Sequence, residues 1–465
     1  MSDGETTPVP RGAERQLTFA PHGHILTNTG VFSPDGRWIV YDVRSDVAGD
    51  VFDGERIEMV NVDTGEVRLL YQSRNGAHCG VATWDTQRDR VVFILGPENP
   101  TLDFAYAACR RQGVIVDIGN PNHAINLDAR ALVSPFTPGA LRGGTHVHVF
   151  SPDGNLVSFT YQDHILSQFT EETPQHDVDL RNLGVSALGK PVKPTHEHER
   201  NHDGIAFSVL VTRTTANPRP GSDDISRAFE EGWVRTPVRP VPSSAEAGNG
   251  DSASEGTGGT WSLAFQGHVL TQDGSTISEV FIVDLPDDLT QSDDGPLQGT
   301  ETRRPFPPEG CVQRRLTCTA GRKYPGIQGP RHWLRSSPAD SRIAFLMKDD
   351  DGIVQLWTIA PAGGRPRQLT HNFRPIASAF SWSPDGNYIA HIMDNSVCLT
   401  DAKSGQTHRL TQPGRGAGAL AGTGSGVPTG ASAPLPEACV FSPDGRHIAF
   451  VRQVDGWNQL FVLSL

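Results

Sequence analysis

Phe32-Ser-Pro-Asp-Gly36, followed by the short apolar stretch Trp38-Ile-Val-Tyr41, decides the fold of this chain of 465 residues. The same Ser-Pro-Asp-Gly tetrapeptide, each time behind an aromatic residue, recurs at Ser151–Gly154, Ser383–Gly386 and Ser442–Gly445. Proline presets the second position of a β-turn, aspartate bonds back to nearby amides, and glycine adopts the positive φ that leads into the returning strand. Each copy therefore predicts a tight hairpin, and hairpins repeated along the chain predict a β-propeller.

The four intact copies and the degenerate hairpins between them predict an all-β fold, a seven-bladed β-propeller of four-stranded antiparallel blades. The fourth blade is the most irregular, and six blades are the alternative if this unit is an insertion. Between its expected strands, Asp223–Trp233 has Ile225 and Phe229 at helical spacing, which predicts one short helix packed on a blade. We expect the strands of the fourth blade at Ile205–Thr212, Trp261–Leu270, Ser278–Leu285 and Val312–Thr317.

The two ends of the chain together supply one blade. The fifth blade ends with an Arg-Gln-Leu-Thr strand at Arg367–Thr370, whereas the C-terminal blade stops at Leu465, one strand short. Glu14-Arg-Gln-Leu-Thr18 repeats that signature at the other end of the chain. We therefore predict that an N-terminal strand completes the C-terminal blade and closes the ring, which removes exposed sheet edges.

Residues 14–465 are accordingly expected to form a single propeller domain, preceded by a disordered tail at residues 1–13. Two further segments, residues 237–259 and 412–436, are rich in Gly, Ser, Ala and Pro. Segments of this composition bury too little apolar surface to offset the entropy of ordering them. We predict that both are disordered loops.

Composition narrows the possible partners. The formal net charge of −13, without a basic run, argues against nucleic acid as a partner. No apolar run is long enough to span a bilayer, and the polar first 16 residues lack the apolar core of a signal peptide. The six cysteines form no CxxC motif or dense framework, which is typical of free thiols in a reducing compartment. We expect a cytoplasmic protein with no membrane partner.

Polar residues gather where the innermost strands should converge on the central channel. Aligned five positions before the motif serine are Asn28, His146, His332 and Glu437 in different blades. His78 occupies a similar place in the second blade, and His148 follows His146 by two residues, a spacing that puts both side chains on one face of a strand.

This polar ring has two interpretations. The histidines and Asn28 can bind main-chain groups or water in a wet channel, as many propellers require. Alternatively, His78, His146, His148 and His332 form a site for one divalent metal, Mn, Zn or Fe, with Glu437 as an oxygen ligand. Arg142 and Arg331 are candidates for binding an anionic group, although arginines near a channel also pair with local carboxylates. His202 is a weaker candidate, since it lies in a charged stretch expected to be a solvated loop.

Two resemblances add to these predictions. The aromatic-Ser-Pro-Asp-Gly hairpins with Arg-Gln-Leu-Thr strands resemble the TolB-type, WD40-like propeller repeat. Gly143-Gly-Thr-His-Val-His-Val-Phe150, Leu95-Gly-Pro-Glu-Asn-Pro100 and Glu230-Glu-Gly-Trp233 resemble the YidR-like proteins, a family of unknown function. That second resemblance spans nearly the whole chain.

The chain is also similar to the oligogalacturonate lyases, seven-bladed propellers that hold a divalent metal with three histidines and a glutamine. The resemblance implies that His146 and His148 match the His-x-His pair of those enzymes, with His332 or His78 as the third histidine. The glutamine is absent, because Gly143 stands at its position.

Two functions follow as hypotheses. The first is a propeller that binds a small polar ligand or a protein partner at its channel or faces. The second is a metal-dependent enzyme that acts on an acidic sugar.

Overall fold

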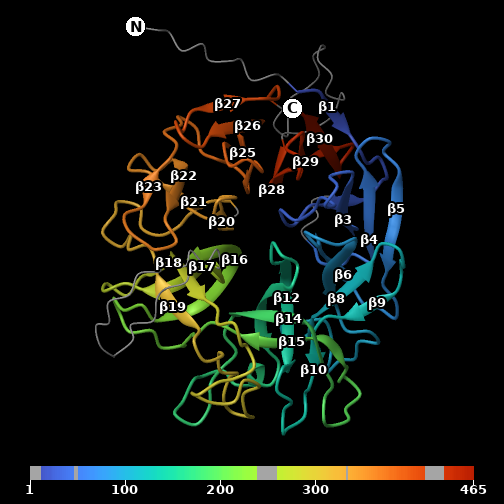
Figure 1. Cartoon of the computed structure of the whole chain (residues 1–465), viewed down its shortest axis with the longest axis vertical. Coiled ribbons are helices and arrows are strands. Elements are labelled where there is room, and N and C mark those ends of the chain that lie inside the picture. Colours follow the sequence, from blue (N-terminus) through green and yellow to red (C-terminus); the bar gives the residue numbers. More distant parts are fainter. Residues whose placement is uncertain (1–11, 47–50, 238–258, 331–332, 414–433) are drawn as a thin grey trace, which may run out of the picture.

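The structure is a computed structural model, and it describes residues 12–46, 51–237, 259–330, 333–413 and 434–465. In these ranges the chain forms seven four-stranded antiparallel sheets and one two-stranded parallel ribbon, with two 3₁₀ turns and no α-helix. The seven sheets are arranged as blades around a common axis (Figure 1). The prediction of an all-β, seven-bladed propeller is therefore confirmed, and the six-bladed alternative is wrong.

The first three blades follow the order of the chain from the axis outwards. Blade 1 contains β2 (Gly23–Ile25), β3 (Trp38–Arg44), β4 (Arg56–Asn61) and β5 (Val67–Gln72). Blade 2 contains β6 (Cys79–Trp84), β7 (Arg90–Leu95), β8 (Gln112–Asp117) and β9 (Ala124–Asn126). Blade 3 contains β12 (Gly143–Phe150), β13 (Leu156–Asp163), β14 (Asn182–Val192) and β15 (Gly204–Leu210). Between blades 2 and 3 lies the ribbon of β10 (Ala129–Arg130) and β11 (Ala140–Leu141).

Three further blades repeat this order. Blade 4 contains β16 (Ile225–Pro237), β17 (Gly259–Leu270), β18 (Thr276–Asp284) and β19 (Val312–Arg315). Blade 5 contains β20 (Arg335–Ser336), β21 (Ile343–Lys348), β22 (Val354–Ile359) and β23 (Arg367–Gln368). Blade 6 contains β24 (Ser381–Trp382), β25 (Tyr388–Met393), β26 (Ser396–Asp401) and β27 (Thr407–Arg409).

Blade 7 joins the two ends of the chain. It contains β28 (Pro434–Phe441), β29 (His447–Val454), β30 (Trp457–Ser464) and the N-terminal β1 (Glu14–Gln16). Glu14 pairs with Leu463 in the β1–β30 ladder, and the Arg452 guanidinium binds the Glu14 carboxylate at 2.6 Å with both side chains almost fully buried. The predicted closure of the ring by an N-terminal strand is confirmed.

The Ser-Pro-Asp-Gly hairpins have the geometry that their residues dictate. In blade 1 the Ser33 hydroxyl donates to Asp35 Oδ1 at 2.6 Å, the same carboxylate oxygen accepts from the Arg37 amide, and Gly36 has φ +72°. The equivalent serine and aspartate of blades 3, 6 and 7 are 2.5–2.6 Å apart. One local hydrogen-bond pattern therefore sets four of the seven inner hairpins.

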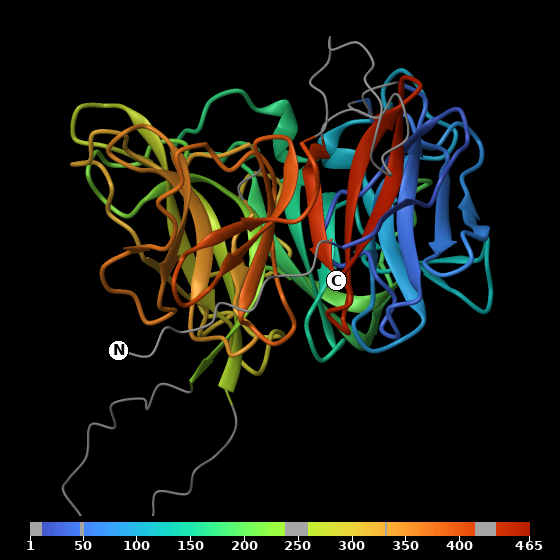
Figure 2. The ribbon, with the colours of Figure 1, turned by 90° about the horizontal axis from the view of Figure 1, so that it is seen from above.

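The strands run between two faces of the ring (Figure 2). The Ser-Pro-Asp-Gly hairpins connect the first and second strands on one face. The connections between second and third strands lie on the opposite face, which we call the loop face; in blades 1–3 their described residues are 45–46 with 51–55, 96–111 and 164–181. The loop face also receives the beginnings of the innermost strands, so side chains from several blades meet there.

The apolar core lies between neighbouring blades. Val40 and Ile57 of blade 1 pack with Trp84 and Phe93 of blade 2, for example, and all four are buried. Burial of this kind contributes roughly 1.5–3 kcal/mol for each large side chain. Packing of sheet on sheet fixes the blades around the axis and thereby positions the residues at the channel.

Two predictions for the fourth blade are wrong. Asp223–Trp233 forms no helix, because β16 runs through Ile225–Pro237 as the innermost strand. The helix-like spacing arises from two bulges, between Ile225 and Ala228 and between Phe229 and Gly232, which add residues to the strand and shift the apolar side chains from their period of two. The stretch beginning at Ile205 forms β15, which pairs with β14 as the outer strand of blade 3.

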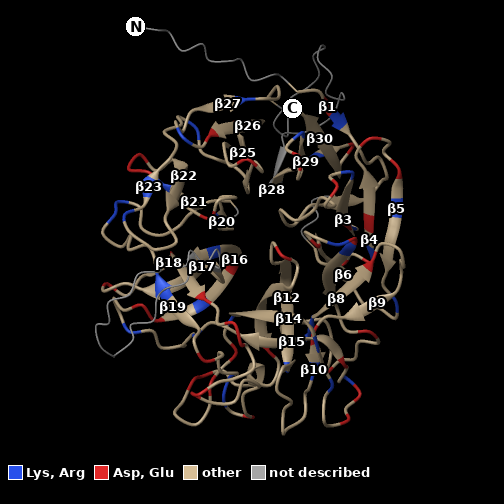
Figure 3. Ribbon diagram, in the orientation of Figure 1, with Lys and Arg blue, Asp and Glu red and all other residues tan. Residues whose placement is uncertain are grey.

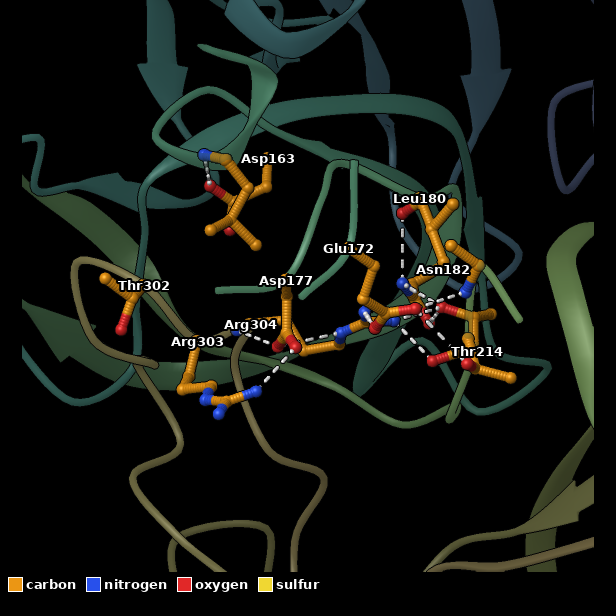
Figure 4. A network of polar contacts seen from close by, with 12 residues as sticks. Asp163, Glu172, Asp177, Leu180, Asn182, Thr214, Thr302, Arg303 and Arg304 are labelled. Carbon is orange, nitrogen blue, oxygen red and sulfur yellow. Dashed lines mark hydrogen bonds and ion pairs between the residues drawn. The ribbon is translucent and has the colours of Figure 1, made fainter. Parts of the chain in front are cut away.

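The long connection between β18 and β19 is fastened to blade 3 by ion pairs. Arg304 binds Glu172 at 2.6 Å and Asp177 at 3.1 Å, and Arg303 also binds Asp177 at 3.1 Å (Figure 4). Arg142 reaches the same connection by donating to the carbonyl oxygens of Thr300 and Arg303. These contacts hold the connection between β18 and β19 against blade 3, so blade 4 keeps its four strands despite the length of this insertion.

The predicted disordered segments fall mostly on residues 1–11, 238–258 and 414–433, which lie outside the described residues, so these predictions stay open. Of the part of the chain that the structure describes, no helix has the length and apolar character needed to cross a membrane.

Candidate functional site

The structure places the sequence-predicted residues in different surroundings. Asn28 is buried and its side-chain amide donates to Thr83 Oγ1 at 3.2 Å, so it links blade 1 to blade 2. His78 precedes β6 on the loop face, with its ring 6.3 Å from the ring of Tyr106. His146 and His148 lie in β12. Arg331 and His332 lie outside the described residues, as does the side chain of Glu437 in β28.

A β-bulge separates His146 from His148. In the β12–β13 ladder His146 pairs with Thr160 and Val149 pairs with Ser158, so β12 contains one extra residue. Val147, between the two histidines, has φ +54°. The bulge breaks the alternation that would place positions i and i+2 on one face of a regular strand.

His148 points into the packing between blades 2 and 3. It is fully buried, and a Cβ built on Gly113 in β8 would lie 2.6 Å from its Nε2 atom. Only a residue without a side chain leaves room for this imidazole. Burial lowers the pKa of His148 to about 3, so the ring is neutral at pH 7.

The described residues alone do not assemble a metal centre, and two of the proposed ligands, His332 and the Glu437 side chain, lie outside them. Within the described ranges, no group of three or more His, Cys, Asp or Glu side chains is arranged to hold a metal ion. The two imidazoles of the His-x-His pair have separate environments, since His148 lies against Gly113 and His146 is surrounded by arginines. The bulge thus changes how the His-x-His pair is arranged, and the prediction of a metal site stays open.

The neutral, buried His148 predicts a pH dependence of stability. Its pKa is about 3 in the folded state and near 6.5 when unfolded, so only the unfolded chain takes up this proton between those values. The contribution of His148 is present in full above pH 6.5 and is lost as the pH falls towards 3. His148→Gln should therefore reduce by about 2 kcal/mol the stability lost between pH 7 and pH 5, measured by urea unfolding.

The solvent-exposed His123→Gln is the control for this measurement. An acid-induced loss of stability of the same size in the wild-type chain and in His148→Gln would contradict the assignment of His148 as a neutral core histidine.

Arg142, predicted as a ligand-binding residue, is engaged within the protein. It is 1% exposed, and its Nε donates to Asp163 at 2.8 Å while its other nitrogens bind the carbonyl oxygens of Thr300 and Arg303. The structure therefore favours the alternative that this arginine pairs with a local carboxylate.

Sequence reasoning missed a group of arginines near His146 on the loop face. The charges of Arg111 and Arg181 act on His146, and the charge of Arg227 acts on Arg181. Arg111 immediately precedes β8, Arg181 immediately precedes β14, and Arg227 lies in β16. The pKa of His146 is held well below its usual range, first by burial and then by the charges of Arg111, Arg181 and Arg44. We call Arg111, His146, Arg181 and Arg227 the channel cluster.

The channel cluster carries positive charge, which two nearby acids, Glu230 and Glu231, offset in part at Arg181. Within the described residues, Arg111, Arg181 and Arg227 form no salt bridge, although charged segments of both signs are interspersed around the ring (Figure 3). Arg181 makes one side-chain hydrogen bond, to Gln162 Oε1 at 3.2 Å. Burial and the neighbouring Arg227 and Arg111 lower the pKa of Arg181 to about 10, which leaves it charged at pH 7.

Several buried polar atoms beside the cluster also lack a partner among the described residues. They are His78 Nδ1, Arg111 Nε, His146 Nδ1 and Arg227 Nε. Buried polar atoms are nearly always hydrogen-bonded to protein or water, so a group of unsatisfied ones at one place indicates a site for water or a ligand.

An aromatic pair forms one side of the site. Phe52 and Tyr106 stack with ring centroids 5.0 Å apart, and the Arg44 and Arg111 guanidiniums lie 4.6 and 5.3 Å from the Phe52 and Tyr106 rings, respectively. A Cβ on Gly80 would lie 2.9 Å from Phe52, so glycine is required for this ring to approach β6. The pair fixes the two arginines in place.

The innermost strands of blades 2, 3 and 4 share one backbone distortion. Each has a bulge with a non-glycine residue at positive φ, namely Val81 at +60°, Val147 at +54° and Glu230 at +56°. Such residues cost of order 1–3 kcal/mol each and cluster at functional sites. The three bulges lie on the inner strands that border the channel cluster.

Comparisons with known proteins agree with this architecture. A family model described as a protein of unknown function, DUF3748, matches residues 78–202, and the dipeptidyl peptidase IV N-terminal region model matches residues 353–458. Among solved structures, an oligogalacturonate lyase in complex with manganese aligns over 98% of this chain and 93% of its own, at 12% identity with a TM-score of 0.55. The oligogalacturonate lyase of Vibrio parahaemolyticus aligns over 100% of this chain and 95% of its own, at 10% identity with a TM-score of 0.53. At these identities the likeness shows a shared fold.

The curated protein YidR of Escherichia coli (strain K12), itself uncharacterised, is 44% identical over 449 residues, which are 96% of this chain and 96% of that protein. Such identity over nearly the full length of both chains confirms the resemblance noted in the sequence. The chain belongs to the YidR family of β-propeller proteins.

Proposed function

We propose that this YidR-family propeller binds a small, hydroxylated carboxylate such as an acidic sugar at the channel cluster. The observation that carries the proposal is the group of three arginines without ion pairs around a neutral histidine on the loop face. The three arginines are half-buried, where charges interact more strongly than in bulk water, and a bound anion would supply a direct partner for them.

The residue types suit such a ligand. A guanidinium binds a carboxylate through two parallel hydrogen bonds, and Arg111 offers an unpaired Nε for this purpose. Neutral His146 has an unpaired Nδ1 that can exchange a hydrogen bond with a hydroxyl group. The rings of Phe52 and Tyr106 add apolar surface of the kind found in small-molecule sites.

The fold likeness to oligogalacturonate lyases supports the choice of a uronate as the first probe. At 10–12% identity that likeness concerns the fold, so a lyase reaction is not part of the proposal. A protein partner on the outer faces and a cytoplasmic location stay predictions, the latter in keeping with six free cysteine thiols.

Calorimetric titration of D-galacturonate into Arg111→Met and Arg181→Met tests the proposal. Each charge-assisted hydrogen bond contributes about 1.5–3 kcal/mol, so each variant should weaken binding by roughly 10- to 100-fold. Arg37→Met is the matched control, since Arg37 is an exposed arginine on the opposite face, paired with Asp35. Equal affinity in the wild-type chain and both channel variants would contradict the proposal.

A further inference from the structure

A second polar pocket lies away from the channel cluster, on the outer side of blade 2. It has a volume of about 420 Å³ and lies between β8, β9, the connection after β7 and the segment that precedes β15. All of its lining residues except Tyr71 and Arg74 fall within residues 78–202, the stretch matched by the family model of unknown function. The pocket is therefore built by the part of the chain that matches that model.

Arg130 brings a buried positive charge to this pocket. It is only 3% exposed, and two of its guanidinium nitrogens donate to the carbonyl oxygens of Arg110 and Arg111. Its Nε has no partner in the described structure, and no described carboxylate forms a salt bridge with it. Asp128 is the acid whose charge acts most strongly on Arg130; burial raises its pKa to about 6, so it is mostly ionised at pH 7 and offsets part of the charge without forming a salt bridge.

His202 provides an acceptor in the same pocket. Its Nδ1 lies 3.3 Å from the carbonyl oxygen of Asp203, so Nδ1 holds the proton and Nε2 holds a lone pair. Nε2 is buried and has no partner among the described residues. Burial lowers the pKa of His202 to about 3, which keeps this ring neutral at pH 7.

Other lining groups hold the pocket open and rigid. Arg200 donates to the carbonyl oxygens of Glu98 and Asn99 at 2.7 and 3.0 Å and lies 4.9 Å from the Phe104 ring. At the exposed rim, the side chain of Arg74 makes no hydrogen bond or ion pair within the described chain. The pocket thus presents two arginines with free donor capacity beside one unoccupied acceptor.

We infer that this pocket is a second ligand site, which binds a small hydroxylated carboxylate. The carboxylate of the ligand accepts hydrogen bonds from Arg130 Nε and from Arg74, and a hydroxyl group of the ligand donates to His202 Nε2. A fully ionised inorganic anion such as sulfate has no donor for His202 and would bind Arg130 alone, whereas a ligand with a carboxylate and a hydroxyl group pairs with Arg130 and His202 together. This inference is independent of the channel cluster, with which the pocket shares no side chain.

The test is calorimetric titration of D-gluconate into the Arg111→Met/Arg181→Met double variant, in which the channel cluster is disabled. Gluconate should still bind, and sorbitol, which has the hydroxyl groups but no carboxylate, should bind at least 10-fold more weakly. Adding His202→Leu or Arg74→Ala should weaken gluconate binding by about 10-fold, while Arg37→Ala, at an exposed arginine on the face opposite the loop face, serves as the control. Thermal unfolding verifies that each variant is folded.

Absence of gluconate binding to the double variant would overturn the inference, as would binding that neither His202→Leu nor Arg74→Ala changes. Because the Arg74 side chain is exposed and makes no hydrogen bond or ion pair within the described chain, its variant decides the outcome even if His202→Leu fails to fold. A failure of the channel proposal would leave these results unaffected, so the two proposals are separable.

Discussion

A chain that begins at residue 19 is expected to lose at least about 5 kcal/mol of stability and to aggregate. The deletion removes β1 and leaves β30 as an open edge of blade 7. It also removes the buried Leu17, worth roughly 1.5–3 kcal/mol, and leaves the fully buried Arg452 without Glu14, which costs about 3–5 kcal/mol. The measurement is thermal unfolding together with light scattering.

The control for this truncation is a chain that begins at residue 12, which retains β1 and its pairing with β30. It should match the full-length chain. If the chain that begins at residue 19 melted at the same temperature as this control, the closure of the ring would contribute nothing to stability.

Arg142→Met should be the most damaging single substitution near the loop face. It removes three hydrogen bonds and leaves the Asp163 carboxylate, which is 4% exposed, without its arginine. Breaking a buried pair in this way costs about 3–5 kcal/mol, because an uncompensated charge stays buried. Guanidinium unfolding should show this loss.

Arg303→Met is the comparison for Arg142→Met, since Arg303 serves the same connection through a side chain that is 41% exposed. Its loss should cost less than about 1 kcal/mol. A stable Arg142→Met variant that loses affinity for an anion would instead support the original prediction of a ligand-binding role for Arg142.

The fold was predictable because its decisive interactions are local. The turn at Ser33–Gly36 depends on hydrogen bonds between residues two to five positions apart, so the sequence reveals each hairpin directly. The N-terminal strand was recognisable because it repeats a signature found at the end of another blade. In blade 4 the sequence predicts a helix where β16 lies. The two bulges of β16 are the reason, since a bulge changes the side-chain period on which strand prediction depends.

The site was less predictable because it depends on loop geometry. The sequence identifies His146 as a site residue. The prediction that His146 and His148 share one face requires a regular strand, and the bulge at Val147 breaks that regularity. Arg111 and Arg181 stand at the ends of long connections, and no local pattern indicates that these ends meet on the loop face. Both arginines stand directly before the third strand of a blade. Once the strands are assigned, this shared position is the one sequence feature that identifies them as candidate site residues.

The central claim, that the channel cluster binds a carboxylate, is tested most directly by comparing D-galacturonate with its methyl ester in calorimetric titrations. The two molecules have nearly the same shape and hydroxyl groups and differ in charge. The account predicts that the acid binds at least 10-fold more tightly than the ester and that 0.5 M salt weakens the binding of the acid. Equal affinity for the acid and the ester, or binding of neither, would contradict it.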